Sequence, residues 1–441
     1  MYNIVKLDSV LLPYSSCTLG CFERIRALGG GLLLDSGSGY PDHIDVICAA
    51  PISVAQMNAN DTDPDSFYRH LRQLLGQHRA TAGGHPVAPG WFGVWSYHLG
   101  QLLESVTCQQ STLPKAWMGF YPAIILIDHQ RCQTHMVSLA DYKDHAQRLQ
   151  SAYLASLQAP ADSTQPFRLT TPFEGNLPEP DYQKAFAQVQ HYIERGDCYQ
   201  INLAREFSAH YEGCPWQAYR VLRQQQSAPM GGYLEADDWN LISLSPERFL
   251  SVNQSNVQSK PIKGTRPRHD NPRQDLANRE ELLGSVKDRA ENLMIVDLLR
   301  NDLGRSCSVG SVKVEKLFDI ESFSNVHHLV STVSGRLAPD LDALDLLAGA
   351  FPGGSITGAP KRRAMEIIAE LEPHGRDFYC GSLMYLDVCG RLDSSILIRS
   401  LVAQAGVIRC WGGGGIVADS TCAAEYQEIN DKVGKILKTI Q

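Results

Sequence analysis

Short apolar segments separated by turn-forming residues limit this chain to a fold rich in β-sheet. In the first part of the chain they occur at Gly31–Leu34, Ile44–Ala49, Trp91–Tyr97 and Ala123–Asp128, each bounded by Gly, Pro or Asp. Such runs predict strands. The later strand-like runs lack the regular spacing of stacked βαβ units, and no fixed-period repeat is visible. The sequence therefore predicts an α+β fold, in which large, mainly antiparallel sheets form a sandwich with helices packed outside.

A segment rich in Pro, Ser and Thr, Ala159–Pro180, divides the chain. A helical, polar stretch runs from about Asp141 to Gln158 before it, and an amphipathic helix begins at Asp181 after it. A composition of this kind is typical of a linker. We therefore predict an N-terminal domain over residues 1–165 and a larger domain over residues 175–441.

Composition narrows the class of partner. The net charge of −8 over 441 residues argues against nucleic acid or an anionic membrane as a general partner. It leaves room for a small anionic substrate, which needs only a local basic pocket. No run approaches the ~18 apolar residues of a membrane-spanning helix, and the N-terminus is not a convincing signal peptide. The twelve cysteines include no C-x-x-C pair and are typical of free thiols. We expect a cytoplasmic protein.

The predicted helix Ser285–Asp302 carries two carboxylates on an apolar surface. At ~100° per residue, Glu291 lies close to Ile295 and Leu298, and Asp288 sits one turn earlier on the same side. An unpaired buried charge costs several kcal/mol. These acids are therefore expected to be protonated, to pair with a base, or to bind a cation.

A second predicted helix, Ala423–Ile440, repeats the pattern with Glu425 and Glu428. Two acidic pairs, each three residues apart, suit a hard cation with oxygen ligands, and Mg²⁺ typically takes one or two carboxylates plus water and substrate oxygens. The alternative is ion pairing with bases nearby in the sequence, namely Arg289, Arg300 or Lys432.

Glycine-rich segments offer candidate anion sites. Phe351–Glu372 contains a glycine-rich turn leading into a helix, where free N–H groups and the hydroxyls of Ser355 and Thr357 could bind an anion. Trp411–Ser420 places four glycines after a strand, which permits close approach of a ligand or of another strand. Arg399 could face a carboxylate. Alternatively, the turn in Phe351–Glu372 is an ordinary loop, and Arg399 belongs to a structural ion pair.

Two residues have the chemistry of a nucleophile and an acid. Lys263 lies in PIKGT near three further cations, and both desolvation and neighbouring positive charge lower a lysine pKa. Glu247 in SLSPERF follows a strand and a proline turn, a plausible position for a general acid. Alternatively, Lys263 is a solvated lysine and Glu247 pairs with Arg248.

Taken in order, these segments resemble the chorismate-using enzymes, a family that includes anthranilate, aminodeoxychorismate, isochorismate and salicylate synthases. The resemblance spans about 195–435 and is weaker in the N-terminal part, at LLLDSG (Leu32–Gly37) and WFGVWSYHLGQLLE (Trp91–Glu104). The matching segments are GDCYQINLA (Gly196–Ala204), SLSPERF (Ser243–Phe249), PIKGTRPR (Pro261–Arg268), RAENLMIVDLLRNDLGR (Arg289–Arg305), HHLVSTVSG (His327–Gly335), GGSITGAPKRRAMEII and GGGGIVADS followed by EYQEINDK.

The resemblance implies roles by position. Glu291 and Glu428 match acids that hold Mg²⁺ against the ring carboxylate of chorismate, and Asp288 and Glu425 match their acidic neighbours. The implied substrate-binding set places Tyr379 and Arg399 near the enolpyruvyl carboxylate, His328 and Ser355 along the ring, and backbone contacts at Gly413 and Gly415. Gln200 and Thr357 complete this set.

Two positions separate the family's activities. Isochorismate and salicylate synthases have a water-activating Lys where this chain has Gln200, whereas ammonia-using members have Gln. Anthranilate synthases typically read P-I-A-G-T where this chain reads P-I-K-G-T. The resemblance therefore implies the activity of the aminodeoxychorismate synthases: Lys263 attacks C2, Glu247 protonates the leaving C4 hydroxyl, and ammonia adds at C4. Anthranilate synthase, and a chorismate-binding subunit without catalysis, are the rival interpretations.

The resemblance also implies a partner and an effector pocket. No G-x-C-x-G elbow surrounds any cysteine, so we expect ammonia to come from a separate glutamine amidotransferase subunit that docks transiently. The family's amino-acid effector pocket, typically for tryptophan, would correspond to Ser36, Pro229 and Met230. The APMGG segment departs from the family pattern there. Met384 also stands where Gly is usual, and we expect it to reshape the pocket wall.

Overall fold

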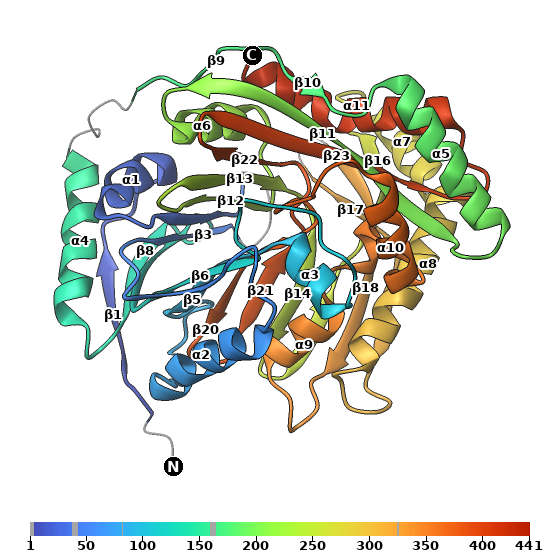
Figure 1. The fold of residues 1–441 in the computed structure, drawn as a ribbon. Coiled ribbons are helices and arrows are strands. Elements are labelled where there is room, and N and C mark those ends of the chain that lie inside the picture. The colour runs from blue at the N-terminus through green and yellow to red at the C-terminus, as the bar shows by residue number, and fades with distance from the viewer. Residues whose placement is uncertain (1–3, 38–42, 82, 159–164, 324–325) are drawn as a thin grey trace.

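The computed structural model describes residues 4–37, 43–81, 83–158, 165–323 and 326–441. Its strands form two large antiparallel sheets (Figure 1). The larger sheet has 13 strands within the described ranges. In spatial order they are β1 (Leu7–Leu12), β8 (Gln133–Leu139), β7 (Ala123–Asp128), β3 (Ile44–Cys48), β2 (Leu32–Asp35), β12 (Met230–Glu235), β13 (Trp239–Ser245), β22 (Ser400–Gln404), β23 (Val407–Ile416), β11 (Gln200–Glu212) and β10 (Glu174–Gly175), with β19 (Gly358–Ala359) and β9 (Arg168–Leu169) also paired to β11.

The smaller sheet has 10 strands within the same ranges. Its order is β16 (Ile262–Pro267), β18 (Val326–Arg336), β15 (Asn256–Ser259), β14 (Arg248–Asn253), β21 (Leu392–Ser395), β20 (Ser382–Asp387), β5 (Gly90–Trp95), β6 (Ala116–Tyr121) and β4 (Ser53–Met57), with β17 (Lys313–Ser322) paired to β18. Both sheets combine strands from either side of the predicted linker, so the two halves of the chain share one framework. The division into residues 1–165 and 175–441 stays a prediction.

Alternation along the strands of the larger sheet explains the sandwich. Leu32 points into the core between the two sheets, whereas its neighbour Leu33 points into a second core on the opposite face. Val46 and Ile47 divide in the same way. Successive side chains of a strand face opposite sides, so a strand apolar at every position can serve two cores. The predicted α+β sandwich with outer helices is confirmed.

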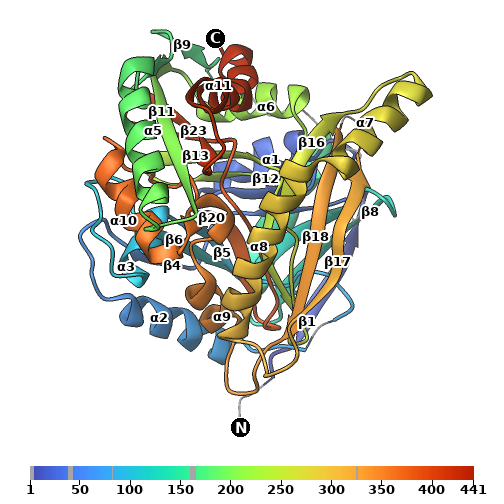
Figure 2. The same cartoon turned by 90° about the vertical axis from the view of Figure 1, so that its right-hand side faces the viewer.

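Helices cover the second core and the flank of the smaller sheet. Figures 1 and 2 show α11 above β11 and β23, and α8 alongside β16–β18. The helices are α1 (Thr18–Ile25), α2 (Pro64–Gln77), α3 (Tyr97–Leu103), α4 (Lys143–Gln158), α5 (Glu179–Glu194), α6 (Pro215–Gln225), α7 (Pro272–Gly284), α8 (Val286–Gly304), α9 (Ala343–Ala350), α10 (Lys361–Leu371) and α11 (Cys422–Thr439), with 3₁₀ turns η1 (Arg26–Leu28) and η2 (Gly354–Ile356). Within the described ranges, none is long and apolar enough to cross a membrane.

Local signals place the helix that carries Glu291. The Ser285 hydroxyl accepts a hydrogen bond from the Asp288 N–H at 3.2 Å, which caps α8 at its first turn. Ile295 and Leu299 are buried on one side, whereas Leu293 is 53% exposed. The sequence overestimated how much of this helix is covered, because an apolar residue can also stay at the surface.

Candidate active site

Lys263 lies at an irregularity in β16. The register of β16 on β18 shifts between Ile262 and Thr265, and Gly264 between them has φ +78°. A β-carbon at Gly264 would lie 2.8 Å from Cγ of Asp288 on α8. Glycine therefore permits both the backbone angle and the close passage of α8. Bulges of this kind redirect side chains next to functional sites.

Glu247 has the electrostatics of a general acid. It lies between β13 and β14 and is 6% exposed. Burial raises the pKa of Glu247 from 4.5 to about 7, although the Lys263 ammonium and hydrogen bonds from the Ile262 N–H and the Ser355 hydroxyl oppose the rise. The Ser355 Oγ–Glu247 Oε1 distance is 3.5 Å. A carboxyl group with this pKa can hold a proton near neutral pH and release it in a reaction.

Lys263 also faces the predicted metal ligands. Its charge acts on Glu291 of α8 and on Glu428 of α11, as well as on Glu247. The fold thus brings four residues from distant parts of the chain within electrostatic range of one another. Lys263 is thus a positive charge common to all three acids.

The acidic pairs on α8 and α11 converge. Burial raises the pKa of Glu291, and the charges of Glu428 and Asp288 raise it further against Lys263 and Lys287. Burial also raises the pKa of Glu425, which is 2% exposed and accepts a hydrogen bond from the Ser420 hydroxyl at 2.7 Å. Asp288 lies 3.4 Å from the guanidinium of Arg266. Oxygen donors that repel one another match the ligand preference of Mg²⁺.

Lys432 occupies a central place that the sequence offered only as an alternative. Its Nζ lies 2.7 Å from Oε1 of Glu428 and donates to the Gly413 carbonyl at 3.0 Å. Burial acts to raise the pKa of Glu428, but Lys432, followed by Lys287 and Lys263, leaves it lowered. The other two bases have different contacts: Arg300 pairs with Asp297, and Arg289 lies over the Phe318 ring.

The glycines of β23 and the start of β11 form a tightly packed surface. A β-carbon at Gly413 would lie 2.5 Å from Oδ1 of Asn202 and 2.8 Å from the Tyr379 hydroxyl. One at Gly415 would lie 2.6 Å from Nε2 of Gln200. A side chain at either position would displace these polar groups, so the glycines let Gln200, Asn202 and Tyr379 lie close against the β23 backbone.

Asn202 is a residue that the sequence interpretation missed, although it lies in the matched segment Gly196–Ala204. Asn202 and Gln200 are 7% and 2% exposed, and their side-chain carbonyl oxygens have no hydrogen-bond partner within the described part of the chain. A buried polar atom without a partner costs ~1–3 kcal/mol. These oxygens are thus ready to accept hydrogen bonds from a ligand.

His328 and Arg399 line a small cavity. It measures about 50 Å³ and includes Thr265 and Pro246 in its wall. The Thr265 hydroxyl lies 2.8 Å from Nδ1 of His328. Burial, with the charge of Arg399, lowers the pKa of His328 to about 4, so the ring is neutral near pH 7. Arg399 is exposed and has a φ of +52°, an uncommon backbone angle for this residue type.

The turn before α10 has mainly a supporting role. The Thr357 hydroxyl donates to the Gly353 carbonyl at 3.0 Å, and the Thr357 carbonyl accepts from the Asn202 N–H at 2.9 Å. Lys361 is buried, 3.0 Å from Asp302. The hydroxyl of Thr357 is therefore engaged within its own turn, while Ser355 faces Glu247.

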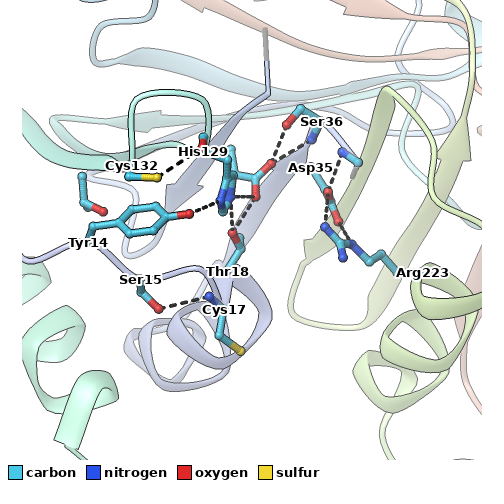
Figure 3. A network of polar contacts seen from close by, with 12 residues as sticks. Tyr14, Ser15, Cys17, Thr18, Asp35, Ser36, His129, Cys132 and Arg223 are labelled. Carbon is cyan, nitrogen blue, oxygen red and sulfur yellow. Dashed lines mark hydrogen bonds and ion pairs between the residues drawn. The ribbon is translucent and has the colours of Figure 1, made fainter. Parts of the chain in front are cut away.

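The predicted effector residues lie at the meeting of β2 and β12. These strands pair with Gly231 opposite Asp35, which brings Ser36 near Met230 at the start of β12, just after Pro229. The Ser36 N–H and hydroxyl both donate to Asp45, at 2.9 and 2.8 Å (Figure 3). Ligand binding at this place stays a prediction. Met384, in β20, is 2% exposed, and its effect on the pocket is likewise untested.

Comparison with known proteins identifies the family. The chorismate binding enzyme family matches residues 32–438. The chain belongs to this family.

Aminodeoxychorismate synthase component 1 of Klebsiella aerogenes is 49% identical over 441 residues, which cover 95% of this chain and 96% of that protein. The Escherichia coli K12 protein of the same name is 45% identical over 442 residues, covering 95% of each. The crystal structure of anthranilate synthase component I from Streptococcus pneumoniae TIGR4 superposes with a TM-score of 0.79 at 28% identity, covering 91% of this chain and 93% of that one. The resemblance inferred from the sequence segments is confirmed.

Proposed function

We propose that the chain is the synthase subunit of an aminodeoxychorismate synthase, which converts chorismate and ammonia to 4-amino-4-deoxychorismate for 4-aminobenzoate and folate synthesis. The placement of Lys263 beside the buried acid Glu247 carries the proposal, because this pair supplies a nucleophile and a proton donor in one site. The identity to aminodeoxychorismate synthases exceeds that to the anthranilate synthase of known structure, which supports the same choice.

The reaction follows from the roles of these groups. The neutral Lys263 Nζ forms a bond to C2 of chorismate, the two ring double bonds shift, and the C4 hydroxyl leaves as water with the proton of Glu247. Ammonia then adds at C4 as the double bonds return and the bond from C2 to Lys263 breaks, which releases the neutral amine, and the ammonium formed at C4 returns a proton to Glu247. The sum is chorismate plus ammonia giving 4-amino-4-deoxychorismate plus water, and the enolpyruvyl group is retained.

The acids on α8 and α11 fit a resident Mg²⁺. Glu291 and Glu428 would hold it, with Asp288 and Glu425 behind them, and Lys263, Lys287 and Lys432 already balance part of the negative charge of these acids. When bound, such an ion supplies positive charge for the ring carboxylate. Gln200 and Asn202 would orient the substrate against β23, Tyr379 and Arg399 would meet its enolpyruvyl carboxylate, and His328 would lie along the ring.

Product identity tests the proposal. Chorismate, Mg²⁺ and ammonium are incubated with the purified chain, and the product is identified by mass. The expected product retains the carbons of chorismate, whereas an anthranilate synthase would release pyruvate and a fluorescent aromatic acid. Release of pyruvate in proportion to turnover would overturn the assignment.

A glutamine amidotransferase subunit would supply the ammonia in a transient heterodimer. Ammonia is mostly protonated at neutral pH, which makes local release valuable. The chain alone is expected to use ammonium salts and not glutamine, and an added glutaminase subunit should confer glutamine dependence. Efficient glutamine hydrolysis by the purified chain alone would contradict this arrangement.

A further inference from the structure

Two histidines and an aspartate converge at the end of the β3–β7 ladder. Ile44 pairs with Asp128, and the next pair is joined by a hydrogen bond from the His129 N–H to the His43 carbonyl at 3.0 Å. Directly paired residues of antiparallel strands present their side chains on the same face. Asp45, two residues after His43, shares that face. The pairing register of β3 with β7 therefore places the two imidazoles and the carboxylate close together on one face of the sheet.

The separations suit ligands of one ion. Nε2 of His129 lies 2.9 Å from Oδ2 of Asp45, and one ligand atom from each of the three residues lies within 4.8 Å of the others. The imidazole rings of His43 and His129 are 4.3 Å apart between centroids. Tetrahedral zinc with bonds of ~2.1 Å places its ligand atoms ~3.4 Å apart. Small side-chain rotations would bring the three atoms to that spacing.

Neighbouring side chains fix the orientation of His129 (Figure 3) and of Asp45. The Tyr14 hydroxyl lies 3.0 Å from Nδ1 of His129, which directs Nε2 toward Asp45. The Thr18 hydroxyl donates to Oδ2 of Asp45 at 2.5 Å, and Ser36 donates twice to Oδ1. Hydrogen bonds of this kind position histidine and carboxylate ligands in metal sites.

One atom of the cluster is unsatisfied. Nε2 of His43 is buried and has no hydrogen-bond partner within the described ranges. An ion pair between His129 and Asp45 accounts for two members of the cluster but gives no role to His43.

We propose that His43, Asp45 and His129 form a site for a divalent transition-metal ion of the zinc class. Two imidazoles and one carboxylate suit Zn²⁺ and its neighbours, whereas Mg²⁺ prefers all-oxygen ligands. None of these residues belongs to the candidate active site. Bound there, the ion links β3 to β7 and, through Thr18, to α1, so its role is structural.

Cobalt(II) provides a test because its visible absorption reports its ligands. The full chain is stripped with a chelator, kept in excess Mg²⁺ to occupy the acidic cluster, and titrated with Co²⁺. We expect one equivalent to give tetrahedral d–d bands without thiolate charge transfer, and Zn²⁺ to displace it and raise the melting temperature. The variant His43→Gln should bind Co²⁺ more than ~10-fold more weakly and lose the thermal shift while keeping its turnover of chorismate.

His191→Gln, at an exposed position of α5, is the matched control and should behave as wild type. His129→Gln should also lose the bands, and circular dichroism shows whether it folds. The site is refuted if His43→Gln binds Co²⁺ with wild-type affinity and bands. Absence of any d–d bands in the wild-type chain at millimolar Co²⁺ would refute it equally.

Discussion

Glu247 of the candidate active site and Asp45 of the N-terminal network, the polar cluster around Asp35 and Asp45, are both buried, yet their carboxyl groups are held in opposite ways. Burial acts to raise the pKa of Asp45, but hydrogen bonds from His129, Thr18 and Ser36 leave it lowered. Asp35 nearby accepts from Arg223 at 2.9 Å and from the Tyr219 hydroxyl at 2.8 Å. In the active site, by contrast, burial raises the pKa of Glu247 to about 7.

This difference is the one expected between a carboxyl group that supports the fold and one poised for chemistry. A carboxylate with several donors is stabilised in its charged form, and removing a partner weakens the protein. A carboxyl group buried with few donors costs stability but acquires a pKa useful for catalysis. Substitutions in the active site should therefore change activity without loss of stability, and substitutions in the N-terminal network should do the reverse.

Lys263→Ala gives the largest expected effect. Loss of a positioned nucleophile should lower turnover by ~10³-fold or more, equivalent to ~4 kcal/mol. Without ammonia, quenched wild-type enzyme should carry an adduct of chorismate less water on Lys263, detected by peptide mass. The control is Lys260→Ala, whose side chain pairs with Glu321 at 2.7 Å and which should stay near wild type. An unmodified Lys263 with full turnover once ammonia is restored would contradict the role.

Glu291→Gln should lower Mg²⁺-dependent turnover by ~10²–10³-fold, because one ligand of the ion is weakened. Its melting temperature should hold or rise, since repulsion from Glu428 and Asp288 is removed. Titration of activity with Mg²⁺ measures the affinity. Asp297→Asn, on the same helix at an exposed position, is the control. Wild-type Mg²⁺ affinity in Glu291→Gln would show that the ion binds elsewhere.

Asp35→Asn should have the opposite profile. It leaves the Arg223 guanidinium without a full counter-charge, and breaking such a buried pair costs ~3 kcal/mol. Chemical denaturation measures the loss, and the folded enzyme should keep its turnover within about twofold. Asp8→Asn, at a surface pair with Lys6, should cost under ~0.5 kcal/mol. A large loss of turnover without loss of stability would remove the distinction between the two regions.

The pH dependence of stability should reveal Glu247. Its folded pKa of about 7 lies above the ordinary 4.5, so the native state holds this proton more tightly than the unfolded chain. The contribution of this protonated carboxyl group to the stability of the folded state is complete below about pH 4.5 and is lost as pH rises through 7. The variant Glu247→Gln, which we expect to be inactive, lacks this titration. Its free energy of unfolding relative to wild type should therefore rise by up to ~2 kcal/mol as the pH is raised from 5 to 8. Equal pH profiles for the two proteins would contradict the raised pKa.

Much of the architecture could be predicted from local sequence. The runs at Ile44–Ala49 and Ala123–Asp128 are strands, and the helices carrying Glu291 and Glu428 form close to their predicted bounds. The alternation of side chains in strands, the capping residues of helices and the helical period of apolar residues all depend on residues close together in the chain. The sequence therefore shows them directly. Which strands pair across the linker, such as β2 with β12, has no local signal.

For the candidate site, the sequence by itself singled out Lys263, Glu247, Gln200 and the two acidic pairs, because each lies in a distinctive local segment. Only the tertiary structure decided their state: the pKa of Glu247, the contact of Lys432 with Gly413, and the unpartnered oxygen of Asn202. It alone also placed His43 beside His129. Burial and charge depend on segments that the sheet register brings together from distant parts of the chain, and that proximity cannot be read from neighbouring residues.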